Sequence, residues 1–310
     1  MSWLFLGMLI VLAGQPSDAG TWSDAQTRHQ TRHQTRAGAG AAHPTGALGF
    51  RRYVAIGDSY TSGAGIPPAQ MGGCFTSTSN YPHLLGRQLG THVTDVSCAG
   101  ATTANLLTGE PMDGDPNPPQ LDGLSRRTDL VSVSLGINDA GFATLIDRCL
   151  EVAQVDSEGA PCRQSFASPT GDLLTDGLPE VRRRMTRALH LVQRRAPHAE
   201  VVLVGYPQLV PEHVTCPELP FASGDYAFAA EFFAAVDATL ASAARRAGVR
   251  FVSLLEPSRG HDICAGAKAW VVGNTPDPRS MAWHPVLTEQ RAAARLIRHA
   301  LESEAHQGTH

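Results

Sequence analysis

Lysine is almost missing from this chain. Lys268 is the only lysine among 310 residues, arginine carries the remaining positive charge, and the formal net charge is −4 at pH 7. A chain of net negative charge does not have the basic footprint of a nucleic-acid-binding protein. We therefore expect no nucleic-acid partner.

Several motifs that mark other protein classes are also missing. No Gly-x-Ser-x-Gly sequence is present, which disfavours the α/β-hydrolase fold. Neither a phosphate-binding loop nor a dinucleotide fingerprint follows the first predicted strand. The six cysteines contain no Cys-x-x-Cys pair, which disfavours zinc and thioredoxin-like sites. We expect neither a metal nor a cofactor.

No apolar run reaches the length of about 20 residues that spans a bilayer. Residues 4–13 form a shorter run, and residues 17–19 supply the small side chains that a signal peptidase favours. We predict a signal peptide over residues 1–19 and hence a secreted, extracellular protein with no integral membrane span after processing. An uncleaved membrane anchor is the alternative, because no lysine or arginine precedes the run.

The next segment is polar and repetitive. Thr27-Arg28-His29-Gln30 is followed at once by Thr31-Arg32-His33-Gln34, and then by glycine and alanine. No hydrophobic period is present that would bury a face, so residues 20–49 are predicted to be a disordered linker. With 42% hydrophobic residues in the chain, residues 50–304 can form one domain with an ordinary core, followed by a tail at 305–310.

Within this domain, short apolar runs alternate with amphipathic segments. We predict strands beginning at residues 53, 92, 129, 201 and 249, and helices over residues 81–89, 178–195, 226–247 and 288–301. Residues 140–176 have no sustained period and are predicted to be an insertion near the site. The alternation predicts an α/β fold, a three-layer αβα sandwich around a mostly parallel sheet. We expect a monomer.

A serine lies directly after the first predicted strand. The strand runs into Gly57, Asp58 and Ser59, which places a hydroxyl at the carboxyl end of a strand, where open α/β sheets bind their ligands. A serine hydroxyl needs a base to take its proton and donors to stabilise the oxyanion that forms. Ser59 is the candidate nucleophile.

Two more strand ends and a late loop offer these groups. The backbone N–H groups of Ser59 and Gly100 and the side-chain amide of Asn138 could converge on one oxyanion. His284, just before the last predicted helix, is the candidate general base, because a neutral imidazole accepts a proton near pH 7. Each residue could instead be an ordinary turn or helix-entry residue. Their occurrence at successive strand ends favours the catalytic interpretation.

These residues resemble the blocks of the SGNH hydrolases, also called the GDSL lipase/esterase family. The matching blocks are Gly57-Asp58-Ser59, Gly100, Gly136-Ile137-Asn138-Asp139 and His284-Pro285. They occur in the family's order, and the resemblance covers residues 52–301. It implies a flavodoxin-like sheet with helices on both faces and catalytic roles for Ser59, Gly100, Asn138 and His284. The six cysteines make the chain similar to secreted actinomycete lipases and esterases with three disulfides.

The chain departs from the family at one position. Many members have aspartate three residues before the histidine, whereas this chain has Met281. We predict a Ser59/His284 dyad in which the backbone carbonyl of Met281 accepts from the imidazole N–H. Asp277 is the alternative, and it is within reach only if the loop folds back.

Six cysteines allow about 15 pairings. The nearest-neighbour scheme places one bridge in each of three loop regions, and it is the scheme that we predict. Its pairs are Cys74–Cys98, Cys149–Cys162 and Cys216–Cys264.

We predict a secreted serine esterase or lipase that hydrolyses carboxylic esters, with lipid or acyl esters as substrates. Phe142 and the aromatic residues between 221 and 233 would either line an acyl groove or form the core face of a helix. A thioesterase or glycan deacetylase of the same fold is one alternative. An exported, non-catalytic carbohydrate- or lipid-binding module is another, suggested by the missing acid at Met281.

Overall fold

The computed structural model describes residues 48–70, 73–110 and 117–307, all within one compact unit. The predicted signal peptide, residues 20–47 of the predicted linker and the last three residues of the predicted tail lie outside the described residues.

A five-stranded parallel sheet forms the centre of the described chain. Its order is β2-β1-β3-β6-β7, and all four neighbouring pairs are parallel. The strands are β1 Arg52–Gly57, β2 His92–Asp95, β3 Leu130–Ser134, β6 Glu200–Val204 and β7 Arg250–Val252. β3 is buried along its whole length, as expected of a parallel strand that is covered on both faces. The predicted α/β fold with a parallel sheet is confirmed.

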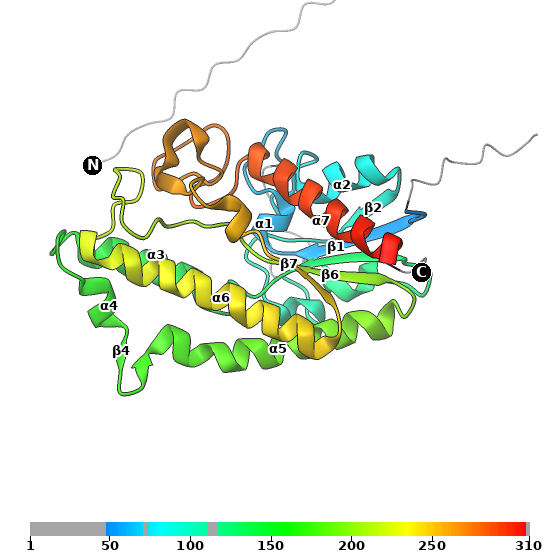
Figure 1. Ribbon diagram of the computed structural model, residues 1–310, viewed down its shortest axis with the longest axis horizontal. Coiled ribbons are helices and arrows are strands. Elements are labelled where there is room, and N and C mark those ends of the chain that lie inside the picture. The colour runs from blue at the N-terminus through cyan, green and yellow to red at the C-terminus, as the bar shows by residue number, and fades with distance from the viewer. Residues whose placement is uncertain (1–47, 71–72, 111–116, 308–310) are drawn as a thin grey trace, which may run out of the picture. The chain divides into compact units, whose positions relative to one another are not determined.

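Helices cover both faces of this sheet (Figure 1). On one face α5 (Leu173–Arg195) packs beside α6 (Tyr226–Ala247), and on the other α2 (Tyr81–Leu89) packs beside α7 (Leu287–Gln307). Successive side chains of β1 point to opposite faces. Val54 therefore joins the core under α5 and α6, whereas Tyr53 joins the core under α2 and α7. The result is the predicted three-layer sandwich.

Short helical turns occupy many of the connections. They are α1 Ser59–Ser62 and the 3-10 turns Thr103–Leu106, Gln120–Gly123, Ser223–Asp225, Glu256–Ser258 and Ile263–Lys268. The segment Ser223–Ala247, which contains α6, is the one helical segment of the described residues with enough length and apolar composition to cross a membrane. A helix that lies in a protein core meets the same criterion, and many residues of α6 are buried here.

The segment 140–176 was predicted to be an insertion without sustained periodicity, and this was wrong. It contains α3 (Phe142–Ala153), α4 (Pro161–Ser165) and a hairpin of β4 (Ala167–Ser168) with β5 (Gly171–Asp172). The buried residues of α3 do have helical spacing, but this spacing covers only the first part of the segment. The Cys149–Cys162 disulfide joins α3 to α4 and adds a restraint that periodicity does not reveal.

Helix α5 begins five residues before its predicted start. Asp172 caps it by accepting hydrogen bonds from the backbone N–H groups of Leu174 (3.0 Å) and Thr175 (2.9 Å). Pro179 then lies inside the helix. The predicted start followed the apolar face that contains Val181, Met185, Leu189 and Val192, and the structure extends this face back to Leu174.

All six cysteines form disulfides. The pairs are Cys74–Cys98, Cys149–Cys162 and Cys216–Cys264, as predicted. Cys98 lies just after β2, and its backbone N–H donates to the carbonyl of Gly57 at 3.0 Å. The first disulfide therefore attaches the loop after α1 to the carboxyl edge of the sheet.

Candidate active site

Ser59 lies at the carboxyl end of β1, as predicted, and is the first residue of α1. Asp58 caps α1 with Oδ1, which accepts from the backbone N–H of Tyr60 at 2.9 Å. Glycine is required at position 57, because a Cβ there would lie 2.0 Å from the Thr61 hydroxyl oxygen. A tight strand-to-helix turn therefore fixes the serine at the edge of the sheet.

Asp58 connects this turn to two other strand ends. Its side chain is fully buried, and Oδ2 accepts from the Tyr206 hydroxyl at 2.6 Å. Tyr206 follows β6, and its hydroxyl oxygen also accepts from the backbone N–H of Ile137 in the loop after β3, at 3.3 Å. Burial raises the pKa of Asp58 to about 7. These contacts give Asp58 a structural role beneath the serine.

Gly100 and Asn138 lie in neighbouring loops at the same edge. Asn138 Nδ2 donates to the carbonyl of Ala101 at 2.9 Å, which ties the loop after β3 to the loop after β2. Gly100 has a φ of 85°, a conformation that favours glycine, and a Cβ added there would meet nothing within 4 Å. The backbone of Gly100 therefore borders open space.

Asp139 anchors these loops from the far side. One carboxylate oxygen accepts from the backbone N–H of Thr103 at 2.9 Å, and the other accepts from the Thr103 hydroxyl at 2.6 Å. Thr103 alone therefore donates to both carboxylate oxygens of Asp139. These bonds give Asp139 a structural role.

The loop that carries His284 packs against the segment just after Ser59. The Tyr60 hydroxyl donates to the carbonyl of Trp283 at 2.7 Å, and the Tyr60 ring centroid lies 5.4 Å from that of His284. The backbone N–H of Met281 donates to the Ala64 carbonyl at 3.3 Å. The fold thus packs the loop of the candidate base against the residue that follows the candidate nucleophile, across more than two hundred residues.

The imidazole contacts a different carbonyl from the predicted one. Nδ1 of His284 lies 2.6 Å from the carbonyl oxygen of Ala282, whereas the carbonyl of Met281 accepts from the backbone N–H of His284 at 3.1 Å. The assignment of Met281 as ring acceptor is therefore wrong by one residue. Trp283 has a φ of 66°, and this left-handed residue turns the chain back so that the Ala282 carbonyl meets the ring.

Asp277 does not contact His284. Its carboxylate is bound by the Arg279 guanidinium, with Arg279 Nη2 at 2.7 Å from Oδ2, and this contact lowers the pKa of Asp277. A carbonyl oxygen only accepts hydrogen bonds, so the His284 proton lies on Nδ1 and Nε2 is left as the basic atom. Burial lowers the pKa of His284, which favours the neutral ring at pH 7.

The aromatic residues that were candidates for an acyl groove belong to the core. The buried side chains are Phe142, Phe221, Tyr226, Phe228, Phe232 and Phe233. The half-buried ring of Trp283 stacks on Phe221, with centroids 5.9 Å apart and an interplanar angle of 16°. Sequence reasoning missed Trp283. Its position next to His284 was the one available signal, since its left-handed backbone is visible only in the structure.

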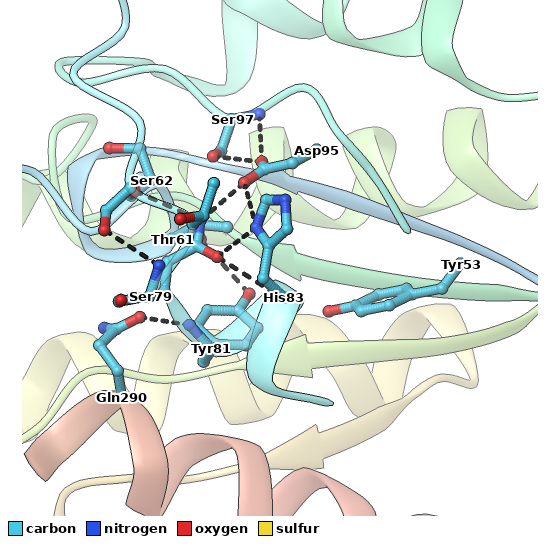
Figure 2. Close-up of polar contacts among 12 residues, drawn as sticks. Tyr53, Thr61, Ser62, Ser79, Tyr81, His83, Asp95, Ser97 and Gln290 are labelled. Atoms are coloured by element: carbon cyan, nitrogen blue, oxygen red, sulfur yellow. Dashed lines mark hydrogen bonds and ion pairs between the residues drawn. The ribbon is translucent and has the colours of Figure 1, made fainter. Parts of the chain in front are cut away.

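Gln290, also missed, joins the first turn of α7 to the nucleophile helix. Its Nε2 donates to the carbonyl of Tyr60 at 3.0 Å, and its Oε1 accepts from the backbone N–H of Tyr81 at 2.6 Å (Figure 2). Nε2 also donates to Glu289, whose pKa burial raises to about 8. Since α7 follows the His284 loop directly, Gln290 holds this loop against α1.

A second polar cluster supports α1 from the side of α2 (Figure 2). Asp95 Oδ2 accepts from Asn80 Nδ2 at 2.6 Å and lies 3.8 Å from His83 Nδ1, while Oδ1 accepts from the Ser97 hydroxyl at 2.6 Å. Asn80 Nδ2 also donates to the carbonyl of Ser62 at 3.3 Å. The end of α1 is thereby fixed to β2 and α2.

The chain matches the GDSL-like lipase/acylhydrolase family over residues 55–287. It belongs to this family. Lipase 2 of Streptomyces coelicolor is 35% identical over 239 residues, which cover 74% of this chain and 79% of that protein. An esterase of Streptomyces scabiei is 30% identical over 273 residues, 76% of this chain and 77% of that protein. The GDSL hydrolase described here is a carboxylic ester hydrolase.

Two solved structures resemble this GDSL hydrolase. The extracellular lipase of Streptomyces rimosus has a TM-score of 0.62 and 26% identity, and phospholipase A1 from Streptomyces albidoflavus NA297 has a TM-score of 0.68 and 24% identity. Each match covers 81% of this chain and 99% of the other chain. At 24% identity, the similarity to phospholipase A1 shows a shared fold only.

Tyr60→Phe should lower kcat of this GDSL hydrolase about fivefold with little change in KM, because one hydrogen bond that holds Trp283 beside His284 is lost. Steady-state kinetics on a soluble ester measure both parameters. Tyr53→Phe is the matched control. It removes a buried 2.6 Å hydrogen bond to Ser132, but Tyr53 belongs to the core under α2 and α7, whereas Tyr60 belongs to the core on the other face of the sheet. Equal loss of kcat in both variants would show that Tyr60 acts only through stability.

Proposed function

We propose that Ser59 and His284 hydrolyse carboxylic esters as a catalytic dyad, with the carbonyl of Ala282 in place of a side-chain acid. The observation that carries this proposal is the 2.6 Å contact between His284 Nδ1 and the Ala282 oxygen, in a loop bonded to the residue after Ser59. A backbone carbonyl fixes the tautomer and orientation of the ring, as an aspartate does in a triad.

The reaction proceeds through an acyl-enzyme. The Ser59 hydroxyl oxygen attacks the ester carbonyl carbon while His284 Nε2 takes the hydroxyl proton. Collapse of the tetrahedral intermediate breaks the bond to the alcohol oxygen, and the alcohol leaves with the proton from Nε2. Water then attacks the acyl group with His284 as base, and a second intermediate releases the carboxylic acid and Ser59.

Three donors would stabilise the oxyanion in both intermediates. They are the backbone N–H groups of Ser59 and Gly100 and the side-chain amide of Asn138. Among the described residues, neither backbone N–H group has a hydrogen-bond acceptor. The Asn138 amide uses one N–H on Ala101 and has a second N–H to donate. The open space in front of Gly100 supports access of a substrate oxygen.

The protein would act outside the cell on lipid or acyl esters. Three disulfides persist best in an oxidising compartment, and they include every cysteine of the chain. The similarity to an extracellular lipase of Streptomyces rimosus also supports this site of action.

A fluorophosphonate probe tests the mechanism directly. We expect labelling at Ser59, identified by peptide mapping, together with turnover of a p-nitrophenyl ester series whose chain-length profile separates a lipase from a short-chain esterase. Because burial lowers the pKa of His284, the rate of labelling should rise with pH and reach half its maximum below pH 6.5. Ser59→Ala is the control. Folded, oxidised protein that is not labelled would overturn the proposal.

A further inference from the structure

A cavity of about 610 Å³ lies at the opposite edge of the sheet from Ser59. Its walls include the first residue of β1, Arg52, and the first residue of β2, His92, together with Arg51 and Arg127. Because these strands are parallel, their amino ends lie one strand length, roughly 17 Å for five residues, from the carboxyl edge that holds the candidate active site.

Strand register gathers the polar side chains of this cavity on one face. Arg52 pairs with His92, and Val54 pairs with Thr94, so all four side chains point to the same side of the sheet. All of them except Val54 are exposed. The loop that contains Arg127 forms the facing wall. The arrangement is a concave surface at the amino ends of β1 and of the edge strand β2, and not a projecting helix face.

Positive charge dominates the cavity. Three arginines line it, Arg51, Arg52 and Arg127, against one acidic residue, Asp129. Asp129 is already engaged, because its two oxygens accept from the backbone N–H groups of Arg51 and Arg52, each at 2.9 Å. Among the described residues, no carboxylate lies within 4.0 Å of the three guanidinium groups. This concentration of charge contrasts with the net charge of −4 for the whole chain.

We propose that this cavity binds a phosphate group. Guanidinium groups donate paired hydrogen bonds to phosphate oxygens, and the hydroxyls of Thr94 and Ser125 on the same walls add further donors. The site is separate from the ester-hydrolysing edge and does not depend on the Ser59 mechanism. Its ligand is either free phosphate, alone or on a small molecule, or the phosphodiester of an anionic lipid headgroup.

Isothermal titration of the purified protein with inorganic phosphate, at constant ionic strength set with chloride, tests the site. Arg52→Gln/Arg127→Gln should weaken the Kd for phosphate by about tenfold or more, since charge-assisted hydrogen bonds are lost. Arg245→Gln/Arg246→Gln removes the same charge from exposed positions at the end of α6 and should leave the Kd unchanged. Circular dichroism verifies that both variants fold.

Cosedimentation with phosphatidylglycerol or phosphatidylcholine vesicles distinguishes the two ligand sources. Loss of phosphatidylglycerol binding in Arg52→Gln/Arg127→Gln, but not in the Arg245/Arg246 control, would assign the cavity to a lipid headgroup. Phosphate binding without vesicle binding would assign it to a soluble phosphate. Absence of binding in both assays, or equal binding by the wild type and both variants, would overturn the proposal.

Discussion

His284→Ala should lower kcat for ester hydrolysis on the order of 10³-fold, because Ser59 loses the base that takes its proton and the acid that returns it. Asp277→Asn should leave kcat within about twofold of the wild type, because the Asp277 carboxylate is held by Arg279 and the His284 Nδ1 contacts the carbonyl of Ala282. Initial rates on a soluble p-nitrophenyl ester measure both effects.

The comparison of these two variants distinguishes a dyad from a triad. A collapse of activity in Asp277→Asn, with unfolding unchanged, would mean that the loop rearranges and that a side-chain triad forms during catalysis. Nearly full activity in His284→Ala would remove this residue from the mechanism. Fluorophosphonate labelling of each variant separates loss of the attacking step from loss of substrate binding.

Gly65→Ala should lower both activity and stability. Gly65 has a φ of 84°, and an added Cβ would lie 2.2 Å from the backbone nitrogen of Met281 and 2.8 Å from the carbonyl carbon of Ser280. Backbone atoms cannot move aside as a flexible side chain can, so the loop that carries His284 must shift. We expect a destabilisation of about 3 kcal/mol and at least a tenfold loss of kcat, on the order of what a displacement of about 1 Å costs.

Gly248→Ala is the matched control for this effect. Gly248 also has a positive φ, 67°, but a Cβ there would meet nothing within 4 Å. Gly248→Ala should therefore lower the free energy of unfolding only by the cost of the left-handed conformation, about 1 kcal/mol, and leave kcat unchanged. Urea unfolding and ester kinetics measure both variants. If Gly65→Ala is no worse than Gly248→Ala in both assays, the His284 loop does not depend on this close approach.

The fold could be predicted because its signals are local. Buried parallel strands appear as short apolar runs such as 130–134, and the helices between them carry one apolar face. The candidate site residues Ser59, Gly100 and Asn138 lie within five residues of the ends of β1, β2 and β3, so the rule that parallel strands end at one edge was sufficient to predict that they lie near one another. The nearest-neighbour disulfide scheme succeeded for a similar reason, since each bridge closes one region of the chain.

Other features depend on contacts that sequence spacing does not encode. α3 was missed although its buried residues Phe142, Leu145, Ile146 and Cys149 have helical spacing, because that spacing ends at Ala153 and the rest of the segment 140–176 does not continue it. The partner of His284 was misassigned by one residue, because the left-handed conformation of Trp283 decides which carbonyl faces the ring. The hydrogen bond from Tyr60 to Trp283 spans 223 residues and follows from the packing of a terminal loop on α1.

The sequence by itself determined the layered parallel sheet, the order of the four family blocks and the identity of the candidate nucleophile and base, because periodicity and strand-end position are properties of neighbouring residues. Only the tertiary structure decided which carbonyl orients His284, that Asp277 is bound by Arg279, and that burial raises the pKa of Asp58 to about 7. Hydrogen-bond partners and desolvation depend on segments far apart in the chain that meet only when it folds.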